Sequence, residues 1–258
     1  MVTRDYLEDL YKKYNKAALI SPDPLQFVAD YAKNEDREIA ALIAACFAYG
    51  NVKQIIKNVG KILGNMGQSP RAFLLANDKQ KLHKIFDGFK YRFTTREELV
   101  NFLHAITQII KEHGSLENMF FAAYSKDKDF VAALRAFAAQ MRGYGPVDSL
   151  MPNPAKNSAL KRLNLFLRWA IRRDEVDPGF WRQIPPAALI VPLDVHMHRV
   201  GRMLGLTQRN QADMKTAVEI SAALARFCPE DPVKYDFCLT RFGIRDDMSE
   251  DDIISTLK

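Results

Sequence analysis

The chain has 258 residues, a formal net charge of +6, a hydrophobic fraction of 48% and only 12 glycines and 12 prolines. This composition excludes disordered, collagen-like and low-complexity chains, and it supplies apolar side chains for one or two buried cores. The longest apolar run, residues 40–49, has about half of the roughly 20 residues that a membrane span needs. We therefore expect no membrane span, and the acidic residue Asp5 so near the start is not typical of a signal peptide.

The three cysteines, Cys46, Cys228 and Cys238, are few and widely spaced. An odd number of cysteines without a Cys-x-x-Cys pair predicts no disulfide framework and is typical of a reducing compartment. We therefore expect a cytoplasmic protein. The same spacing argues against the four-cysteine iron–sulfur cluster.

Apolar residues recur at helical spacing along nearly the whole chain, and no stretch shows the strict alternation of a half-buried strand. The sequence therefore predicts an all-α protein. In chain order, the expected helices cover residues 6–16, 25–32, 36–48, 52–63, a short stretch from 70, 79–86, 97–113, 116–124, 130–141, 157–173, 195–204, 213–226 and 233–241. The helix at 36–48 is apolar on nearly all sides, which is typical of a central buried helix. Thr95 and Glu98 have the spacing of a capping box at the start of the helix that follows.

The positive charge is concentrated in residues 151–210, where ten basic residues stand against four acidic ones. The rest of the chain is neutral, so this segment carries the whole excess. The basic residues of the segment are Lys156, Lys161, Arg162, Arg168, Arg172, Arg173, Arg182, Arg199, Arg202 and Arg209. Such a concentration favours a surface that binds an anion, most simply nucleic-acid phosphate, although solvated helix faces produce the same pattern.

Asp194 stands immediately before the predicted helix at 195–204. An aspartate in this position accepts backbone N–H bonds and stays ionised, so it is a fixed anion that can stabilise a developing cation. The alternative is that Asp194 only caps the helix.

The residues around Asp194 resemble a known segment. Asp194-Val195-His196, followed by Arg199-Val200 and by Met203-Leu204-Gly205-Leu206, is similar to the stretch that carries the catalytic aspartate in the helix-hairpin-helix base-excision DNA glycosylases. The chain as a whole resembles more closely a bacterial domain family of unknown function. That resemblance is carried by the stretches 48–50, 89–93, 161–169, 192–194 and 231–237.

The glycosylase resemblance implies a lysine whose amine attacks the sugar C1′ and forms a Schiff base, as in the bifunctional members. Lys161 is the candidate, and its long separation from Asp194 is similar to that in the archaeal 8-oxoguanine glycosylase branch. An amine becomes nucleophilic when burial, neighbouring cations or a base remove its proton. Lys156 is the second candidate nucleophile. The alternative for Lys161 is a solvated charge or a phosphate contact.

The glycine-rich hairpin that gives the superfamily its name is missing before Lys161. Residues 151–160 contain two prolines and no glycine, so backbone N–H groups cannot approach a phosphate as they do in the hairpin. Either Lys156, Asn157 and Ser158 bind phosphate through their side chains and the helix N-terminus, or duplex DNA is not the ligand. The further phosphate contacts that the resemblance implies are Arg162, Arg168, Arg199 and Arg202.

Aromatic and amide side chains are candidates for a base pocket. Tyr49 and Asn51 follow the central helix at the place where glycosylases contact a base, and Phe166 and Trp169 could stack on an extruded base. The alternatives are that Gly50 is only a helix C-cap and that these aromatic side chains belong to the core.

A metal site is not expected. Asp194, His196 and His198 are close in sequence, but helix residues two apart point to nearly opposite sides, and the remaining pair is too few for zinc. Nucleotide-binding, dinucleotide-binding and serine-hydrolase motifs are also missing. We expect no cofactor.

The resemblance implies two helical lobes, one formed by residues 32–173 and the other by residues 1–31 together with 174–258, with Lys161 and Asp194 facing one cleft. The function it implies is a DNA-repair-like N-glycosylase, with AP-lyase activity through Lys161, that removes an 8-oxoguanine-like base. The alternative is a nucleic-acid-binding protein without catalysis, on DNA more readily than RNA. A weaker third reading is a purely structural or protein-interaction role.

Overall fold

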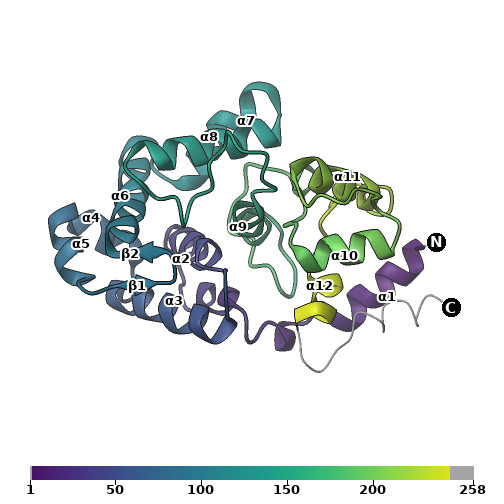
Figure 1. The fold of residues 1–258 in the computed structure, drawn as a ribbon, viewed down its shortest axis with the longest axis horizontal. Coiled ribbons are helices and arrows are strands. Elements are labelled where there is room, and N and C mark those ends of the chain that lie inside the picture. The colour runs from purple at the N-terminus through teal and green to yellow at the C-terminus, as the bar shows by residue number, and fades with distance from the viewer. Residues whose placement is uncertain (1, 245–258) are drawn as a thin grey trace. The chain divides into compact units, whose positions relative to one another are not determined.

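The computed structural model describes residues 2–244, which are predominantly helical (Figure 1). The α-helices of this part are α1 (Arg4–Tyr14), α2 (Asn34–Cys46), α3 (Val52–Met66), α4 (Pro70–Ala76), α5 (Lys79–Ile85), α6 (Arg96–His113), α7 (Leu116–Asp127), α8 (Phe130–Gly143), α9 (Lys161–Ile171), α10 (Val195–Met203), α11 (Met214–Ala225) and α12 (Asp236–Ile244). Short 3₁₀ helices cover Ala17–Leu19, Pro24–Val28 and Pro186–Ala188. The prediction of a helical protein is confirmed. Within residues 2–244, no helix is both long enough and apolar enough to cross a bilayer.

One small hairpin departs from the all-α prediction. Strands β1 (Lys90–Tyr91) and β2 (Thr94–Thr95) pair in antiparallel register, with Lys90 opposite Thr95 and Tyr91 opposite Thr94. The two-residue turn between them has Arg92 at a φ of 50°, the left-handed conformation that tight hairpins require. Strands of two residues are too short to show an alternating pattern, so the sequence did not reveal them.

The chain forms two compact units. The central unit is Ser21–Lys156, and the terminal unit combines the residues up to Ile20 with the residues from Asn157 onward. The predicted division placed the boundaries at 31/32 and 173/174. The difference matters for the candidate site, because α9 belongs to the terminal unit together with α10 and α12.

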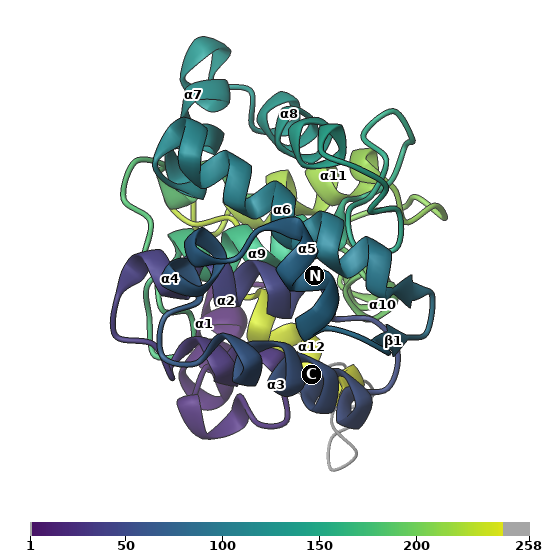
Figure 2. The ribbon, with the colours of Figure 1, turned by 90° about the vertical axis from the view of Figure 1, so that its left-hand side faces the viewer.

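The central unit is built around α2. Every residue from Ile39 to Phe47 is fully buried, as expected for a helix that is apolar on all sides. Its two buried acidic side chains hold other helices: Asp36 accepts hydrogen bonds from the Ser69 hydroxyl and the Arg71 N–H at the start of α4, and Glu38 accepts from the N–H of Leu116 at the start of α7. The carboxylates therefore satisfy N–H groups that the helices cannot satisfy internally. Helices α6, α7 and α8 lie beside one another in both views (Figures 1 and 2).

The predicted helix starts depend on capping residues, and most of these are confirmed. Ser69 caps α4, and Thr95 and Glu98 form a complete capping box at α6. Asp194 caps α10. Helix α9, however, begins at Lys161, four residues later than predicted, because Leu160 has a φ of 48° and interrupts the helical backbone.

The terminal unit joins the two ends of the described chain. Helix α1 packs against α12, and Glu8 accepts hydrogen bonds from the Lys234 ammonium and the Tyr235 hydroxyl, both at 2.6 Å. After α9 the chain folds back, and the Gly179 N–H donates to the Trp169 carbonyl. A Cβ on Gly179 would lie 2.5 Å from the Arg172 carbonyl oxygen, so this reversal requires glycine.

Candidate functional site

The terminal unit brings Lys161 and Asp194 together. The Lys161 Nζ lies 3.3 Å from Asp194 Oδ2, and the two side chains are 36% and 16% exposed. Asp194 Oδ1 accepts the Met197 N–H at 2.8 Å, which is the capping bond of α10. One carboxylate oxygen therefore fixes the side chain to a helix N-terminus, while the other faces the amine. The arrangement pairs a positioned anion with an amine that solvent can reach.

The backbone in front of Lys161 is held in an unusual conformation. Leu160 is a buried, non-glycine residue at positive φ, a state that costs of order 1–3 kcal/mol and persists only where the surroundings fix it. Two bonds fix it here: the Leu160 N–H donates to the Ser158 hydroxyl at 3.3 Å, and the buried Asn164 amide donates to the Ala159 carbonyl at 2.9 Å. Lys161 is thus the first residue of α9, at the positive end of the helix dipole.

Several exposed residues lie on α10, the helix that Asp194 caps. Val195 directly follows Asp194 and is 66% exposed, an apolar surface beside the two charges. Arg199 and Arg202 are exposed on the same helix, and Arg162 is half-buried beside Lys161. His198 is half-buried, and its Nε2 lies 2.9 Å from the Arg209 carbonyl oxygen. The predicted phosphate contacts on α10 are therefore accessible.

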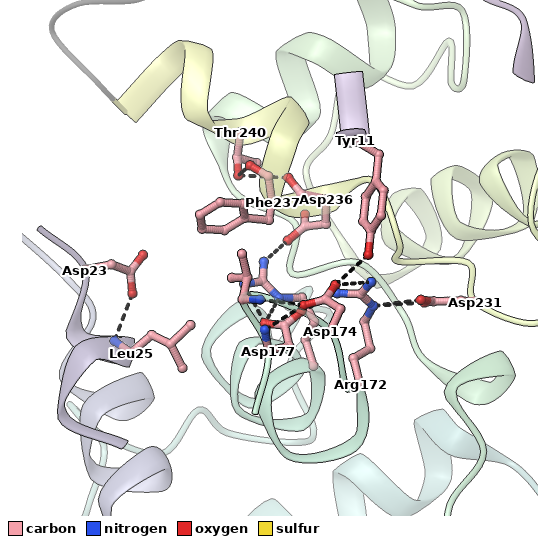
Figure 3. Close-up of polar contacts among 12 residues, drawn as sticks. Tyr11, Asp23, Leu25, Arg172, Asp174, Asp177, Asp231, Asp236, Phe237 and Thr240 are labelled. Carbon is pink, nitrogen blue, oxygen red and sulfur yellow. Dashed lines mark hydrogen bonds and ion pairs between the residues drawn. The ribbon is translucent and has the colours of Figure 1, made fainter. Parts of the chain in front are cut away.

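A buried charge cluster occupies the other end of α9 (Figure 3). Arg168 contacts Asp177 at 3.1 Å and also pairs with Asp236. Arg172 pairs with Asp177, and it lies 2.8 Å from both Asp174 and Asp231. Buried ions are tolerated only where they are paired and hydrogen-bonded in this way, so the cluster is a structural connection between α9, the loop after it and the start of α12.

The charge states in this buried charge cluster follow from the pairing. Burial would lower the pKa of Arg172, but the charges of Asp177 and its other carboxylate neighbours outweigh burial and raise it. Burial opposes ionisation of Asp174, yet Arg172 and two backbone N–H bonds lower the pKa of Asp174 below its ordinary value. The Tyr11 hydroxyl donates to Asp174 at 3.0 Å, and burial together with that carboxylate raises the pKa of Tyr11. The tyrosine therefore stays neutral and acts as a donor.

The Lys161–Asp194 pair and the buried charge cluster are electrostatically connected. Burial raises the pKa of Asp236, and the charge of Asp194 adds to this rise, whereas Arg168 opposes it. Because Asp236 is the first residue of α12 and Asp194 caps α10, the packing of these two helices brings the carboxylates near each other. The charge of Asp194 therefore acts on the carboxylate of Asp236 in the buried charge cluster.

The predicted interface needs one correction at Arg168. This side chain is buried and its guanidinium is committed to two carboxylates, so in this fold it has no accessible surface for a phosphate. Lys156, Asn157 and Ser158 are all exposed, and the Asn157 amide donates to Asp213 at 3.2 Å. The positive excess of residues 151–210 is likewise not all available to a ligand. Arg168, Arg172 and Arg209 are paired with aspartates, several of which lie beyond residue 210.

The candidate base-pocket residues fall into two groups. Phe166 and Trp169 are buried, and Phe166 packs edge-to-face against Trp181 at 5.2 Å, as core aromatic residues do. Their predicted role in stacking on a base would require the core to open. Tyr49 and Asn51 belong to the central unit, where Tyr49 is half-buried and Asn51 is exposed and caps α3.

Two groups of charged residues were not found from the sequence. Asp174 and Asp177 of the buried charge cluster closely follow α9, but Asp231 and Asp236 lie about 60 residues further along the chain, so the sequence did not show that these carboxylates meet Arg168 and Arg172. Lys57, Lys90 and Arg92, which line a pocket on the central unit, were also missed. Among residues 2–244, no three His, Cys, Asp or Glu side chains gather in an arrangement suited to a metal ion.

The fold and the site define a predominantly helical protein whose terminal unit presents a partly exposed lysine–aspartate pair. Residues 23–245 match the family model described as "Protein of unknown function (DUF2400)", and the chain belongs to this family. No curated protein and no solved structure matches the chain.

Proposed function

We propose that this protein acts on nucleic acid as an N-glycosylase with lyase chemistry, using Lys161 and Asp194. The observation that carries the proposal is the 3.3 Å approach of the Lys161 amine to the Asp194 carboxylate, with the lysine side chain partly exposed. The sequence likeness around Asp194 to the base-excision glycosylases adds to it. Oxidised bases such as 8-oxoguanine are the substrate class that this likeness suggests.

In the proposed reaction, the Lys161 ammonium first gives a proton to Asp194 or to water. The neutral amine then attacks the sugar C1′, a C–N bond forms, and the C1′–base bond breaks with its electron pair leaving on the base, which takes up the proton that Lys161 gave away, so that Asp194 is again a carboxylate. Opening of the sugar ring, with proton transfer to its oxygen, gives the Schiff base. Asp194 stabilises the positive charge that develops at C1′, because its position is fixed before the reaction by the capping bond to Met197.

The proposed contacts to the nucleic-acid backbone are the exposed basic and polar side chains near the pair. They are Lys156, Asn157, Ser158, Arg162, Arg199 and Arg202. Leu160 offers no side-chain oxygen to the first N–H groups of α9, so this helix start also suits an anion. Without the glycine hairpin, these side chains and this helix N-terminus would have to position the strand.

Borohydride trapping tests the proposal. Purified protein is incubated with oligonucleotides that contain an abasic site or 8-oxoguanine, and the reductant converts a Schiff base to a stable covalent complex. The complex is expected with the wild type, abolished in Lys161→Gln and strongly reduced in Asp194→Asn. Lys215→Gln, an exposed lysine on α11, is the matched control and leaves trapping unchanged. Trapping that persists in Lys161→Gln but is lost in Lys156→Gln would move the nucleophile to Lys156.

A second candidate function is nucleic-acid binding without catalysis. It is favoured by the loop before α9, where Pro152 and Pro154 lack the N–H groups that the glycosylase hairpin offers to DNA, while Arg199 and Arg202 remain exposed. This function predicts affinity that falls steeply with salt, loss of affinity in Arg199→Gln and Arg202→Gln, and no covalent complex under any condition.

A further inference from the structure

The central unit contains a pocket of about 350 Å³ between the first turns of α3 and strand β1. Its lining includes the cations Lys57, Lys90 and Arg92, together with the amide side chains of Asn51 and Gln54. None of the lining residues in this described part of the chain is acidic. Clefts lined by one sign of charge concentrate ions of the opposite sign, so the pocket suits an anion.

These three cations differ from the buried arginines of the terminal unit, Arg168 and Arg172, in having no carboxylate partner. In the described part of the chain, Lys57, Lys90 and Arg92 form no ion pair, and Lys57 and Lys90 are exposed. Like charges gathered in one pocket repel one another, and an anion placed between them removes that repulsion. The amide N–H groups of Asn51 and Gln54 add neutral donors for its oxygen atoms.

The wall formed by the hairpin is held rigidly. The Tyr91 hydroxyl donates to the Tyr49 carbonyl, and the Tyr49 hydroxyl lies 2.5 Å from Thr94 Oγ1. Gly50 has a φ of 94°, and a Cβ there would lie 2.9 Å from Arg92 Cδ and 3.1 Å from the Tyr91 hydroxyl. Only glycine allows the hairpin to pack this closely on the loop before α3. The backbone that carries Lys90 and Arg92 is therefore held in place before any ligand arrives.

An exposed aromatic ring lies next to the cations. Phe93, at the tip of the hairpin, is 74% exposed, and the Arg92 guanidinium carbon lies 5.6 Å from the centre of its ring. A large apolar side chain at such an exposed turn gains nothing from burial within this unit. Aromatic rings beside basic grooves are the common platform on which unpaired bases stack.

We propose that this pocket binds the phosphate of an unpaired nucleotide while the base stacks on Phe93. The shared chemistry is a phosphate ester carrying a planar base, supplied either by a free mononucleotide or by a single strand of nucleic acid. The inference goes beyond the proposed function, because the pocket lies in the central unit and its binding does not require Lys161 to be a nucleophile.

Fluorescence anisotropy with the full chain tests the proposal. The probes are a labelled single-stranded oligonucleotide of about ten nucleotides and the same strand made entirely of abasic units, a length within the site sizes of single-strand-binding folds. Lys57→Gln and Lys90→Gln are each expected to weaken the binding of both strands about three- to tenfold. Each is also expected to lower by about one the slope with which the logarithm of the binding constant falls with the logarithm of the salt concentration. Lys61→Gln, one turn further along α3 and exposed, is the matched control and leaves the affinity unchanged.

Phe93→Ala separates the base contact from the phosphate contact. It is expected to weaken binding of the base-bearing strand about tenfold and to leave the abasic strand unchanged, because only the stacking contact is lost. Competition with an unlabelled mononucleotide identifies the source. If the mononucleotide displaces the labelled strand at a concentration similar to that of an unlabelled strand, the pocket binds a free nucleotide. If it does not displace the labelled strand, the pocket binds a strand.

Three outcomes would overturn the inference: no binding of any probe at low salt, equal effects of Lys57→Gln and Lys61→Gln, or equal weakening of both strands by Phe93→Ala. Far-ultraviolet circular dichroism of each variant checks that the fold is intact, and Lys57→Gln and Lys90→Gln change exposed side chains whose loss leaves packing intact. The outcome is independent of borohydride trapping, because Lys161→Gln removes the trapped complex and leaves the effects at Lys57 and Phe93 in place.

Discussion

The two ends of α9 use positive charge in opposite ways. At its first residue, Lys161 contacts a single carboxylate and keeps its amine partly exposed. Near its last turn, Arg168 and Arg172 are buried and fully engaged with four aspartates from the following loop and the region of α12. In the linear sequence all three residues look alike, as basic positions of one helix. The comparison teaches that the carboxylate partners, some of which come from distant parts of the chain, decide whether a cation is available for a ligand.

The largest expected effect is on the unfolding free energy, when the buried charge cluster at the C-terminal end of α9 is disrupted. Arg172→Met removes the only guanidinium that contacts Asp174 and Asp231 in the described part of the chain, and leaves their charges uncompensated. Breaking a buried pair in this way costs about 3–5 kcal/mol of unfolding free energy. Arg202→Met, at an exposed position of α10, is expected to change stability by no more than about 0.5 kcal/mol. Urea denaturation measures both, and equal losses would contradict the structural role of the buried charge cluster.

The next effect is a dependence of stability on pH through Asp174. Its pKa in the folded protein is lower than in the unfolded chain, so its ionised form stabilises the fold above the ordinary value of 3.8, and this contribution is lost as pH falls further. The stability difference between the wild type and Asp174→Asn is therefore expected to be largest near neutral pH and to shrink below that value. Urea midpoints for both proteins between neutral pH and pH 3 provide the measurement. A difference that grows on acidification would show that the sign is wrong.

The smallest effect concerns the exposed end. A double-mutant cycle on Lys161→Gln and Asp194→Asn is expected to give a coupling of no more than about 1 kcal/mol, as for other solvent-accessible pairs. Asparagine at 194 retains an oxygen that can cap α10, so the cycle reports mainly the charge contact. The coupling should fall further at about 1 M salt, where the Debye length is about 3 Å. A coupling energy as large as that of the buried ion pairs would show that Lys161 has a structural role like that of Arg168 and Arg172.

Much of the helical fold could be predicted from local signals. The central position of α2 follows from its apolar faces, and the starts of α4, α6 and α10 follow from Ser69, Thr95 and Asp194, because capping residues act on their immediate neighbours. The hairpin at Lys90–Thr95 was not predicted because its strands are too short to show the alternation of buried and exposed residues that is typical of a strand. The late start of α9 was missed because hydrogen bonds from the Leu160 N–H to Ser158 and from Asn164 to the Ala159 carbonyl hold Leu160 in the left-handed conformation. Helix propensities do not predict such bonds.

The candidate site was predictable in part. Lys161 and Asp194 were paired through a resemblance, and the structure places their charged atoms 3.3 Å apart. Their roles in chemistry stay a prediction. The alternative that Phe166 and Trp169 belong to the core agrees with their burial, whereas the buried state of Arg168 was not predicted, because it depends on the distant carboxylate of Asp236. Charge counts within one segment do not include such distant partners.

The discontinuous terminal unit has a consequence for how the protein is made. Helix α1 is synthesised before the central unit, yet Glu8 accepts hydrogen bonds from Lys234 and Tyr235, which are synthesised after it. The central unit, in contrast, is complete once Lys156 has been synthesised. Because compact units fold as soon as their sequence is available, the inserted central unit is expected to fold first during translation, before α1 has the partners that form its core. Helix α1 is therefore synthesised before the central unit and reaches its final packing after it.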